Sequence, residues 1–283
     1  MADYLELAAR GRTAWWRWLL AGFVALVMWL LLCIVMIAGL EITRLLPADI
    51  SQILTDPRHV RIFFGATGAL FGGLTLCFAL ATRWLQGKRF TDITGPWRWR
   101  RFLTGLTVWL VVCVLAAGLD LAIEPAGFRE SLGPRTAELV LWSAPSLFIQ
   151  TFTEEFIFRG YVTQGWLLAT RRPLAAALLS GVLFAALHIP NGWPQAASAL
   201  AFGVVTALIA IRTGSIAFTF GMHLANNLFG AFVVVSANDV FRGAPALFTQ
   251  STPNLMWLDA AVPFFALAVA LWFAGVRPGE ASA

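Results

Sequence analysis

The side chains best suited to catalysis or ligand binding lie inside apolar segments in the second half of the chain. They are Glu154, Glu155, Arg159, His188, His223 and Asn227. Ionisable groups at membrane depth are costly and mark functional sites by default. The chain has three histidines, and only His59 lies in a polar loop. The set therefore predicts a site for chemistry.

Two adjacent glutamates precede an arginine in the segment Thr153-Glu154-Glu155-Phe156-Ile157-Phe158-Arg159. On a helix Glu155 and Arg159 are four residues apart and share a face, so they can form an ion pair. Glu154 is rotated by about 100° from Glu155 and can project elsewhere. The alternative is a buried Glu155–Arg159 pair that only fixes packing. A second carboxylate is harder to explain as packing, so Glu154 is the candidate for chemistry.

The histidine segments supply complementary groups. His188 ends the apolar segment Phe184–His188 and, taken alone, could be an ordinary hydrogen-bonded core histidine. His223 and Asn227 are four residues apart on one helical face, where they provide donors suited to a developing oxyanion. The alternative for this pair is interhelical hydrogen bonding, worth about 0.6 kcal/mol on average in membranes. Asn226 points off this face, and we expect a structural role for it.

Together these groups are of the kinds that a hydrolytic enzyme uses. A Glu–His pair can deprotonate water, and a His–Asn pair can hold the carbonyl oxygen. Glu154, His188 and His223 could equally be ligands of Zn²⁺, with water in an open position. No HExxH motif is present, and no GxSx or GxGD segment is paired with a suitable base. Hydrolysis by an activated water is therefore favoured over serine- or aspartate-based catalysis.

The composition predicts a membrane environment for these groups. Of 283 residues, 59% are hydrophobic and 12% charged, whereas soluble domains carry about 25% charged residues. The mean hydropathy is +0.76, so lipid must be the main solvent. The net charge of +5 comes from arginines and lysines in short loops between apolar runs. This placement indicates membrane topology and contact with anionic lipid, not nucleic-acid binding.

Eight apolar runs are long enough, at about 20 residues, to cross a bilayer. They are residues 16–40, 62–84, 102–123, 138–169, 173–190, 194–212, 214–236 and 257–275. The fourth is too long for one simple span, and we expect a short interfacial helix followed by a span that begins near Pro145. The chain is thus predicted to be an all-α polytopic protein of one membrane domain.

The basic residues alternate between loops in a way that orients the chain. Clusters at 10–17, 83–101 and 171–172 and single arginines at 212 and 277 fall on one side, and the intervening loops are mixed or weakly charged. By the positive-inside rule, both termini are expected in the cytoplasm, with the protein in the plasma (inner) membrane. An even number of spans agrees with this orientation.

Three of these segments resemble motifs of one known family. EEFIFRG at 154–160 matches an EExxxR pattern, FAALH at 184–188 an FxxxH segment, and HLANN at 223–227 an HxxxN segment. Their order and spacing resemble the CAAX prenyl protease and abortive-infection family of intramembrane proteases, also called CPBP proteases. The resemblance covers about residues 138–236, and the first three spans match only in being hydrophobic.

The resemblance implies an eight-helix, CAAX-protease-like fold and a glutamate-dependent endopeptidase. By this likeness Glu154 activates water with His188, and His223 and Asn227 form the oxyanion site. The remaining motif positions, which would support the site, are Glu155 and Arg159. The family has been described both as metal-dependent and as metal-independent, so a zinc ion stays open. Eukaryotic members cut prenylated CaaX proteins, and bacterial relatives are associated with bacteriocin processing, self-immunity or regulated membrane proteolysis.

The resemblance also divides the chain and sets one geometric condition. Residues 1–137 would be N-terminal spans, 138–236 a CPBP-like catalytic core, and 237–283 a last loop and span. At about 1.5 Å per residue, His188 lies roughly 24 Å along its span but His223 only about 13 Å along its own. For the two histidines to meet, their helices must be tilted or staggered.

The expected function is cleavage of a peptide or a lipidated protein tail near the membrane. The alternative is a non-catalytic immunity or partner-binding membrane protein, in which the polar cluster binds a peptide or holds helices together. A transporter ranks last because the sequence has neither an inverted repeat nor paired broken helices.

Overall fold

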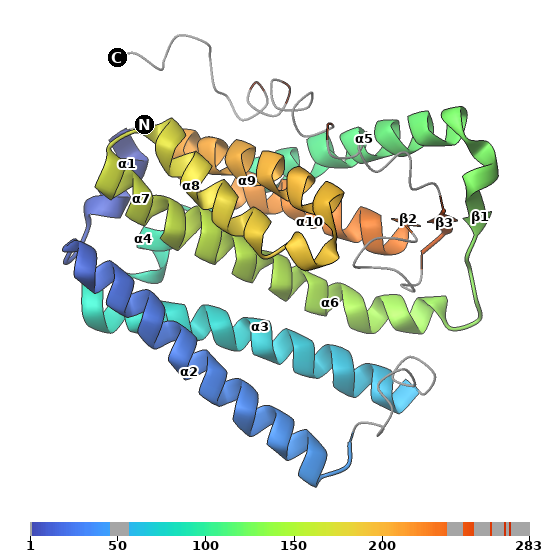
Figure 1. Cartoon of the computed structure of the whole chain (residues 1–283), viewed down its shortest axis with the longest axis horizontal. Coiled ribbons are helices and arrows are strands. Elements are labelled where there is room, and N and C mark those ends of the chain that lie inside the picture. Colours follow the sequence, from blue (N-terminus) through green and yellow to red (C-terminus); the bar gives the residue numbers. More distant parts are fainter. Residues whose placement is uncertain are drawn as a thin grey trace.

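The computed structural model describes residues 2–45, 57–236 and 246–251, together with the single residues 261, 269 and 272. This part of the chain is almost entirely helical (Figure 1). Its α-helices are α1 (Ala2–Ala9), α2 (Trp15–Ile42), α3 (Pro57–Gln86), α4 (Phe90–Thr94), α5 (Trp99–Ile123), α6 (Thr136–Glu154), α7 (Thr163–Thr170), α8 (Pro173–Ala186), α9 (Trp193–Thr213) and α10 (Ala217–Phe232). The expected all-α polytopic membrane fold is confirmed.

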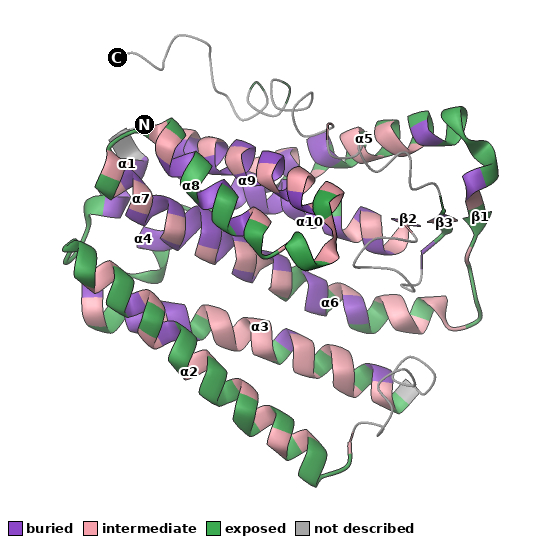
Figure 2. Ribbon diagram, viewed as in Figure 1, coloured by how far each residue is buried: buried purple, intermediate pink, exposed green. Residues whose placement is uncertain are grey.

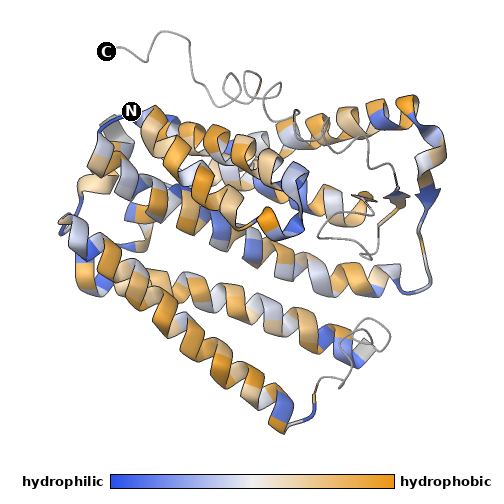
Figure 3. Cartoon of the chain, viewed as in Figure 1, coloured by the Kyte–Doolittle hydropathy of each residue, from blue (hydrophilic) through white to orange (hydrophobic). Residues whose placement is uncertain are grey.

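The first, second, third and sixth predicted spans correspond to long apolar helices. Among the described residues, Trp15–Ile42, Arg58–Gln86, Trp99–Ile123 and Trp193–Thr213 are long and apolar enough to cross a membrane. Figure 2 shows α2 exposed along most of its length, and Figure 3 shows that the same helix is strongly hydrophobic. Only 11% of its most apolar window is buried, against 61% in α9. Lipid is therefore the solvent for α2, whereas α9 belongs to the protein core.

The other predicted spans have different outcomes. The fifth is shorter than expected, because α8 ends at Ala186 and a turn and the 3-10 segment η4 (Ile189–Asn191) follow. The seventh is α10, which stops at Phe232. The eighth, at 257–275, lies outside the described residues apart from three isolated positions, so the count of eight spans stays a prediction.

The fourth predicted span is one continuous helical element, not an interfacial helix followed by a span. Pro145 lies inside α6, and the expected break there is wrong. A proline removes one backbone hydrogen bond, which a span tolerates where neighbouring groups compensate. The hydrogen-bond pattern instead changes in η3 (Glu155–Val162), a π-helical segment that leads into α7. Such segments often occur at functional sites.

Helix α10 lies in the core against α5. A Cβ atom on Gly221 would lie 2.1 Å from the carbonyl oxygen of Phe102, and one on Gly105 would lie 2.1 Å from that of Phe218. The two glycines therefore allow the backbones of α5 and α10 to touch, as small residues do in membrane proteins. This contact sets the helix that carries His223 directly against the third predicted span.

A small sheet joins the ends of these two helices. Strand β1 (Phe128–Glu130) follows α5 after a short 3-10 turn, η2 (Pro125–Gly127), and β2 (Val234–Ser236) follows α10. Strand β3 (Phe248–Gln250) lies between them, antiparallel to β1 and parallel to β2. Strands of three residues give too little alternation to be predicted from the sequence.

The short N-terminal helix α1, also not predicted, is held against η3 and α7 by side-chain hydrogen bonds. The Lys88 ammonium group donates to the carbonyl oxygens of Leu7 and Ala8 at 3.0 and 2.9 Å and to Gln164 Oε1 at 2.9 Å. Burial lowers the pKa of Lys88 to about 8. The Tyr4 hydroxyl donates to the carbonyl oxygen of Arg159, within the π-helical segment. A first-turn side chain thus satisfies a backbone acceptor of η3.

We expect Tyr4→Phe to destabilise the protein by about 1–3 kcal/mol, because it leaves this buried carbonyl without its donor. The measurement is thermal unfolding of the purified protein in detergent. Thr43→Val is the matched control, since it removes a hydroxyl that bonds the Gly39 carbonyl at an exposed helix end. Equal unfolding temperatures for the two variants would contradict the proposed tie between α1 and η3.

Candidate active site

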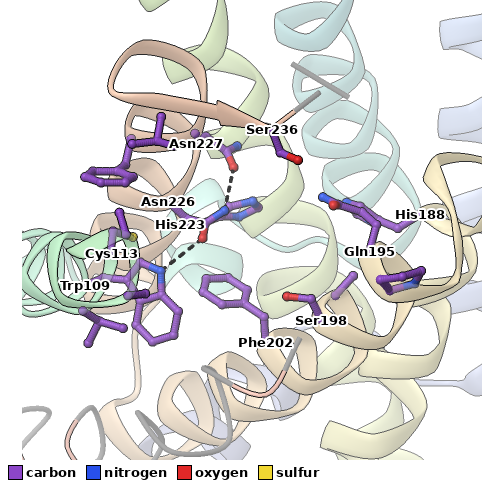
Figure 4. Close-up of a pocket in the computed structure, with 18 of the residues that line it drawn as sticks. Trp109, Cys113, His188, Gln195, Ser198, Phe202, His223, Asn226, Asn227 and Ser236 are labelled. Carbon is purple, nitrogen blue, oxygen red and sulfur yellow. Dashed lines mark hydrogen bonds between the residues drawn. The ribbon is translucent and has the colours of Figure 1, made fainter. Parts of the chain in front are cut away.

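A cavity of about 230 Å³ brings together the predicted catalytic residues. Glu154, His188, His223 and Asn227 all line it (part of its lining is labelled in Figure 4). Its walls come from α5, α6, α8, α9, α10 and strands β2 and β3. Segments that are far apart in the sequence therefore meet at one place, as the motif combination predicted.

His188 and His223, which were expected at different distances along their spans, line one cavity. The end of α8 before His188 contributes to this arrangement. Because α8 stops at Ala186, His188 lies in the turn beyond it and not inside a membrane helix. His223 lies in the middle of α10. The turn thus presents His188 to the same cavity that His223 reaches from within the core.

His223 lies between the two adjacent glutamates. Its Nδ1 atom is 2.8 Å from Glu155 Oε1, and its Nε2 atom is 3.6 Å from Glu154 Oε2. The Glu155 side chain is fully buried, whereas that of Glu154 is 18% exposed. The sequence predicted that Glu154 and Glu155 project differently. It did not predict that one imidazole would connect them.

The expected ion pair between Glu155 and Arg159 is present next to the His223 imidazole. Arg159 Nη1 lies 3.1 Å from Glu155 Oε1, and both side chains are fully buried. Arg159 Nε also donates to Thr206 Oγ1 at 2.8 Å, and its guanidinium carbon lies 4.2 Å from the centre of the Phe184 ring. A cation over a ring face is favourable. Charge, hydrogen bond and ring together hold Arg159, and through it Glu155, in one place.

Two asparagines of α10 form a chain of hydrogen bonds along the cavity wall. Asn227 Nδ2 donates to Thr151 Oγ1 at 3.0 Å, and its Oδ1 accepts from Asn226 Nδ2 at 3.4 Å. Asn226 Oδ1 in turn accepts from Trp109 Nε1 at 3.2 Å (dashed lines in Figure 4). Asn226 therefore contacts Asn227 and also lines the cavity, and its structural role stays a prediction.

His188 is oriented by the last turn of α8, which precedes it in the chain. Its Nδ1 lies 2.8 Å from the Phe184 carbonyl oxygen. This contact assigns the proton to Nδ1 and leaves Nε2 as an acceptor. The direct partners that the structure gives Glu154 are Gln150, at 3.2 Å, and His223. His188 lines the same cavity without a direct hydrogen bond to Glu154 among the described contacts.

The expectation that Glu154, His188 and His223 could be zinc ligands is not supported by their arrangement. Among the described residues, no group of three His, Cys, Asp or Glu side chains could hold a metal ion. The Nδ1 contacts of His223 and His188 leave both Nε2 atoms available, so only the separation of the described side chains, no three of which come close enough together, speaks against zinc. These residues do not fit a zinc site, and no step below is derived through a metal.

Sequence reasoning missed Gln150 and Asp120, which also line the cavity. Gln150 precedes Glu154 by four residues, so the i,i+4 rule could have found it. Asp120 is an acidic residue inside the third predicted span, which by itself is a signal of function.

Comparisons with known proteins show what the chain is similar to. Residues 136–229, which include all four predicted catalytic residues, match the family model described as type II CAAX prenyl endopeptidase Rce1-like. The chain is also similar to the uncharacterized protein YyaK of Bacillus subtilis (strain 168), with 29% identity over 290 residues that cover 94% of this chain and 92% of the relative. No solved structure matches the chain.

The buried pair predicts unequal effects of two neighbouring substitutions on stability. Glu155→Gln leaves Arg159 buried without its counter-charge and should destabilise the protein by about 3–5 kcal/mol. The matched control Glu154→Gln alters a group that faces the cavity and should change stability little. Thermal unfolding in detergent measures both.

The double variant Glu155→Gln/Arg159→Met separates the lost charge balance from lost packing. It should unfold at a higher temperature than Glu155→Gln alone, because it removes both charges of the pair. If Glu155→Gln were as stable as the wild type, the pair would not be the structural support described here.

Proposed function

We propose that this integral membrane protein is an intramembrane endopeptidase, because residues 136–229 match the type II CAAX prenyl endopeptidase Rce1-like family model. Its nucleophile is a water molecule activated by Glu154. The observation that carries the proposal is the meeting of Glu154, His188, His223 and Asn227 at one cavity. Positive-inside patterning supports cytoplasmic termini in a plasma (inner) membrane.

The charges around the cavity support a reactive Glu154 carboxylate. Glu155 and Arg159 compensate each other in the interior. If His223 carries both ring protons, as its proposed donor role requires, the charges of Glu154, Glu155, Arg159 and His223 sum to zero. In a medium of low dielectric such balance avoids a large desolvation penalty. Glu155 accepts the Nδ1 proton of His223, and His223 Nε2 lies 3.6 Å from Glu154 Oε2, so a donor role for Nε2 requires a second proton on the ring.

The chemical step follows from these positions. Glu154 accepts a proton from water, and the resulting hydroxide adds to the carbonyl carbon of the scissile peptide bond. His188, with Nδ1 bound to the Phe184 carbonyl, offers Nε2 as a second acceptor that orients the water. When the C–N bond breaks, the proton held by Glu154 passes to the leaving amine. General acid–base catalysis of this kind contributes about 10²–10⁴-fold.

His223 and Asn227 are the proposed donors to the oxyanion. Asn227 gives one amide hydrogen to Thr151 and keeps the other for the cavity. His223 Nε2–H adds a charged donor one helical turn away on the same face of α10. Donors that are fixed before the reaction act without reorganisation. Asn226, Thr151 and Glu155 are positioning residues because they hold these two donors and do not meet the substrate carbonyl.

Glu154→Gln should lower kcat by at least about 10³-fold, since the amide cannot accept the proton. His188→Ala and His223→Ala should each abolish detectable turnover. The assay is cleavage by purified protein in detergent of a quenched peptide library with prenylated and unmodified C-termini. Glu138→Gln, at a surface carboxylate on the same helix that pairs with Arg61 and Arg135, is the matched control.

Retained cleavage by Glu154→Gln would eliminate this mechanism. If neither protein cleaved but the preparation captured a peptide partner, the non-catalytic binding function would replace it. A zinc chelator should leave cleavage unchanged, because the described residues supply no three-ligand set. Loss of cleavage with chelator would require a metal held by other groups.

Asn227→Ala should lower kcat by about 10²–10³-fold with little change in KM, because the lost donor acts on the transition state. The control Asn191→Ala removes an amide in η4 that does not line the cavity. An equal loss in kcat for both variants, or a change confined to KM, would argue against an oxyanion role.

A further inference from the structure

One buried carboxylate in the cavity has no place in the proposed chemistry. Asp120, near the end of α5, is only 3% exposed and lines the same cavity as Glu154. Its Oδ2 accepts a hydrogen bond from Gln250 Nε2 at 3.2 Å. Its Oδ1 is buried and has no hydrogen-bond partner among the residues that the structure describes. Asp120 is thus fixed on one side by strand β3 and unsatisfied on the other.

The surroundings of Asp120 do not compensate its charge. None of the described residues that line the cavity is a lysine or an arginine. The buried Arg159 is paired with Glu155 and does not line the cavity. A buried carboxylate without a cation is costly, and an asparagine would tie α5 to β3 equally well. Ionisable residues in spans typically mark substrate pathways, so a missing cation points to a ligand.

The distance from the reaction centre can be estimated along α5. Residues Trp109, Val112, Cys113, Ala116, Ala117 and Asp120 form one stripe of that helix along the cavity. Trp109 bonds Asn226, next to the proposed oxyanion donor Asn227. Eleven residues from Trp109 to Asp120 span about 16 Å. An extended peptide covers this distance in about five residues. A long basic side chain that reaches toward Asp120 lowers the number of residues needed to about three.

We propose that Asp120 binds a cationic side chain of the substrate, a lysine or arginine about three to five residues from the scissile bond. The apolar stripe between Trp109 and Asp120 accommodates the intervening residues. Gln250 holds the carboxylate so that Oδ1 meets the incoming cation. This inference rests on the proposed peptidase function and narrows its substrates to peptides with a basic residue at a fixed distance.

The first test measures binding without cleavage, in the Glu154→Gln background. The probes are fluorescein-labelled apolar 15-residue peptides with lysine, norleucine or glutamate at one of several consecutive positions. At the preferred position, the lysine peptide should bind about tenfold or more tightly than the norleucine peptide. Equal affinities for lysine, norleucine and glutamate peptides, the absence of binding included, would overturn the proposal.

Three variants then separate charge from structure. Asp120→Asn keeps the size and the bond to Gln250 and should reduce the affinity for the lysine peptide to that for norleucine. Asp120→Glu keeps the charge and should retain a preference for lysine. Glu124→Gln removes an exposed carboxylate one turn further along the chain and should have no effect. An unchanged preference in Asp120→Asn, with a normal unfolding temperature, would contradict the assignment.

The same peptides with Glu154 intact distinguish this inference from the proposed function. Cleavage that depends on Glu154 but not on the basic residue would overturn the role of Asp120 and leave the peptidase proposal standing. Binding that depends on Asp120 without any Glu154-dependent product would support the cation site and remove the peptidase proposal.

Discussion

The buried contact of Glu155 with Arg159 and His223 is the interaction on which the site depends. Two carboxylates and two basic groups lie within a few ångströms in a protein whose solvent is largely lipid. In such a medium each charge must be compensated nearby. Arg159 also bonds Thr206 of α9 and lies over the ring of Phe184 of α8. The charge balance therefore holds α8 and α9 in position relative to η3.

The π-helical segment η3 gives these charges their directions. It begins at Glu155, next to the residue that faces the cavity. Side-chain hydroxyls bond two of the backbone carbonyls of this segment. Tyr4 bonds the Arg159 carbonyl, and Thr163 and Ser180 bond that of Phe158. The segment is therefore supported from α1, α7 and α8 at once, which keeps Glu154 and Glu155 on separate sides of His223.

How much could be predicted from the sequence depends on how local each feature is. Helical spacing was enough for the Glu155–Arg159 pair, and residue type inside apolar runs was enough to select Glu154, His188, His223 and Asn227. The contact of His223 with Glu155 was not predictable, because it joins residues 68 positions apart. The π-helical segment and the three-residue strands have no periodicity that a sequence pattern could reveal. The end of α8 before His188 depends on a turn that the apolar composition concealed.

The attachment of α1 to η3 sets an order of assembly during synthesis. Tyr4 and the carbonyl that it binds are separated by 155 positions in the chain. At about 5–20 residues per second, roughly 8–30 s pass between the synthesis of the two partners. Throughout that interval the π-helical segment has not been made, and only the contacts of α1 with earlier residues such as Lys88 can form. A nascent chain therefore cannot complete this support for Glu154 before α7 has emerged, which delays the finished site until most of the membrane domain exists.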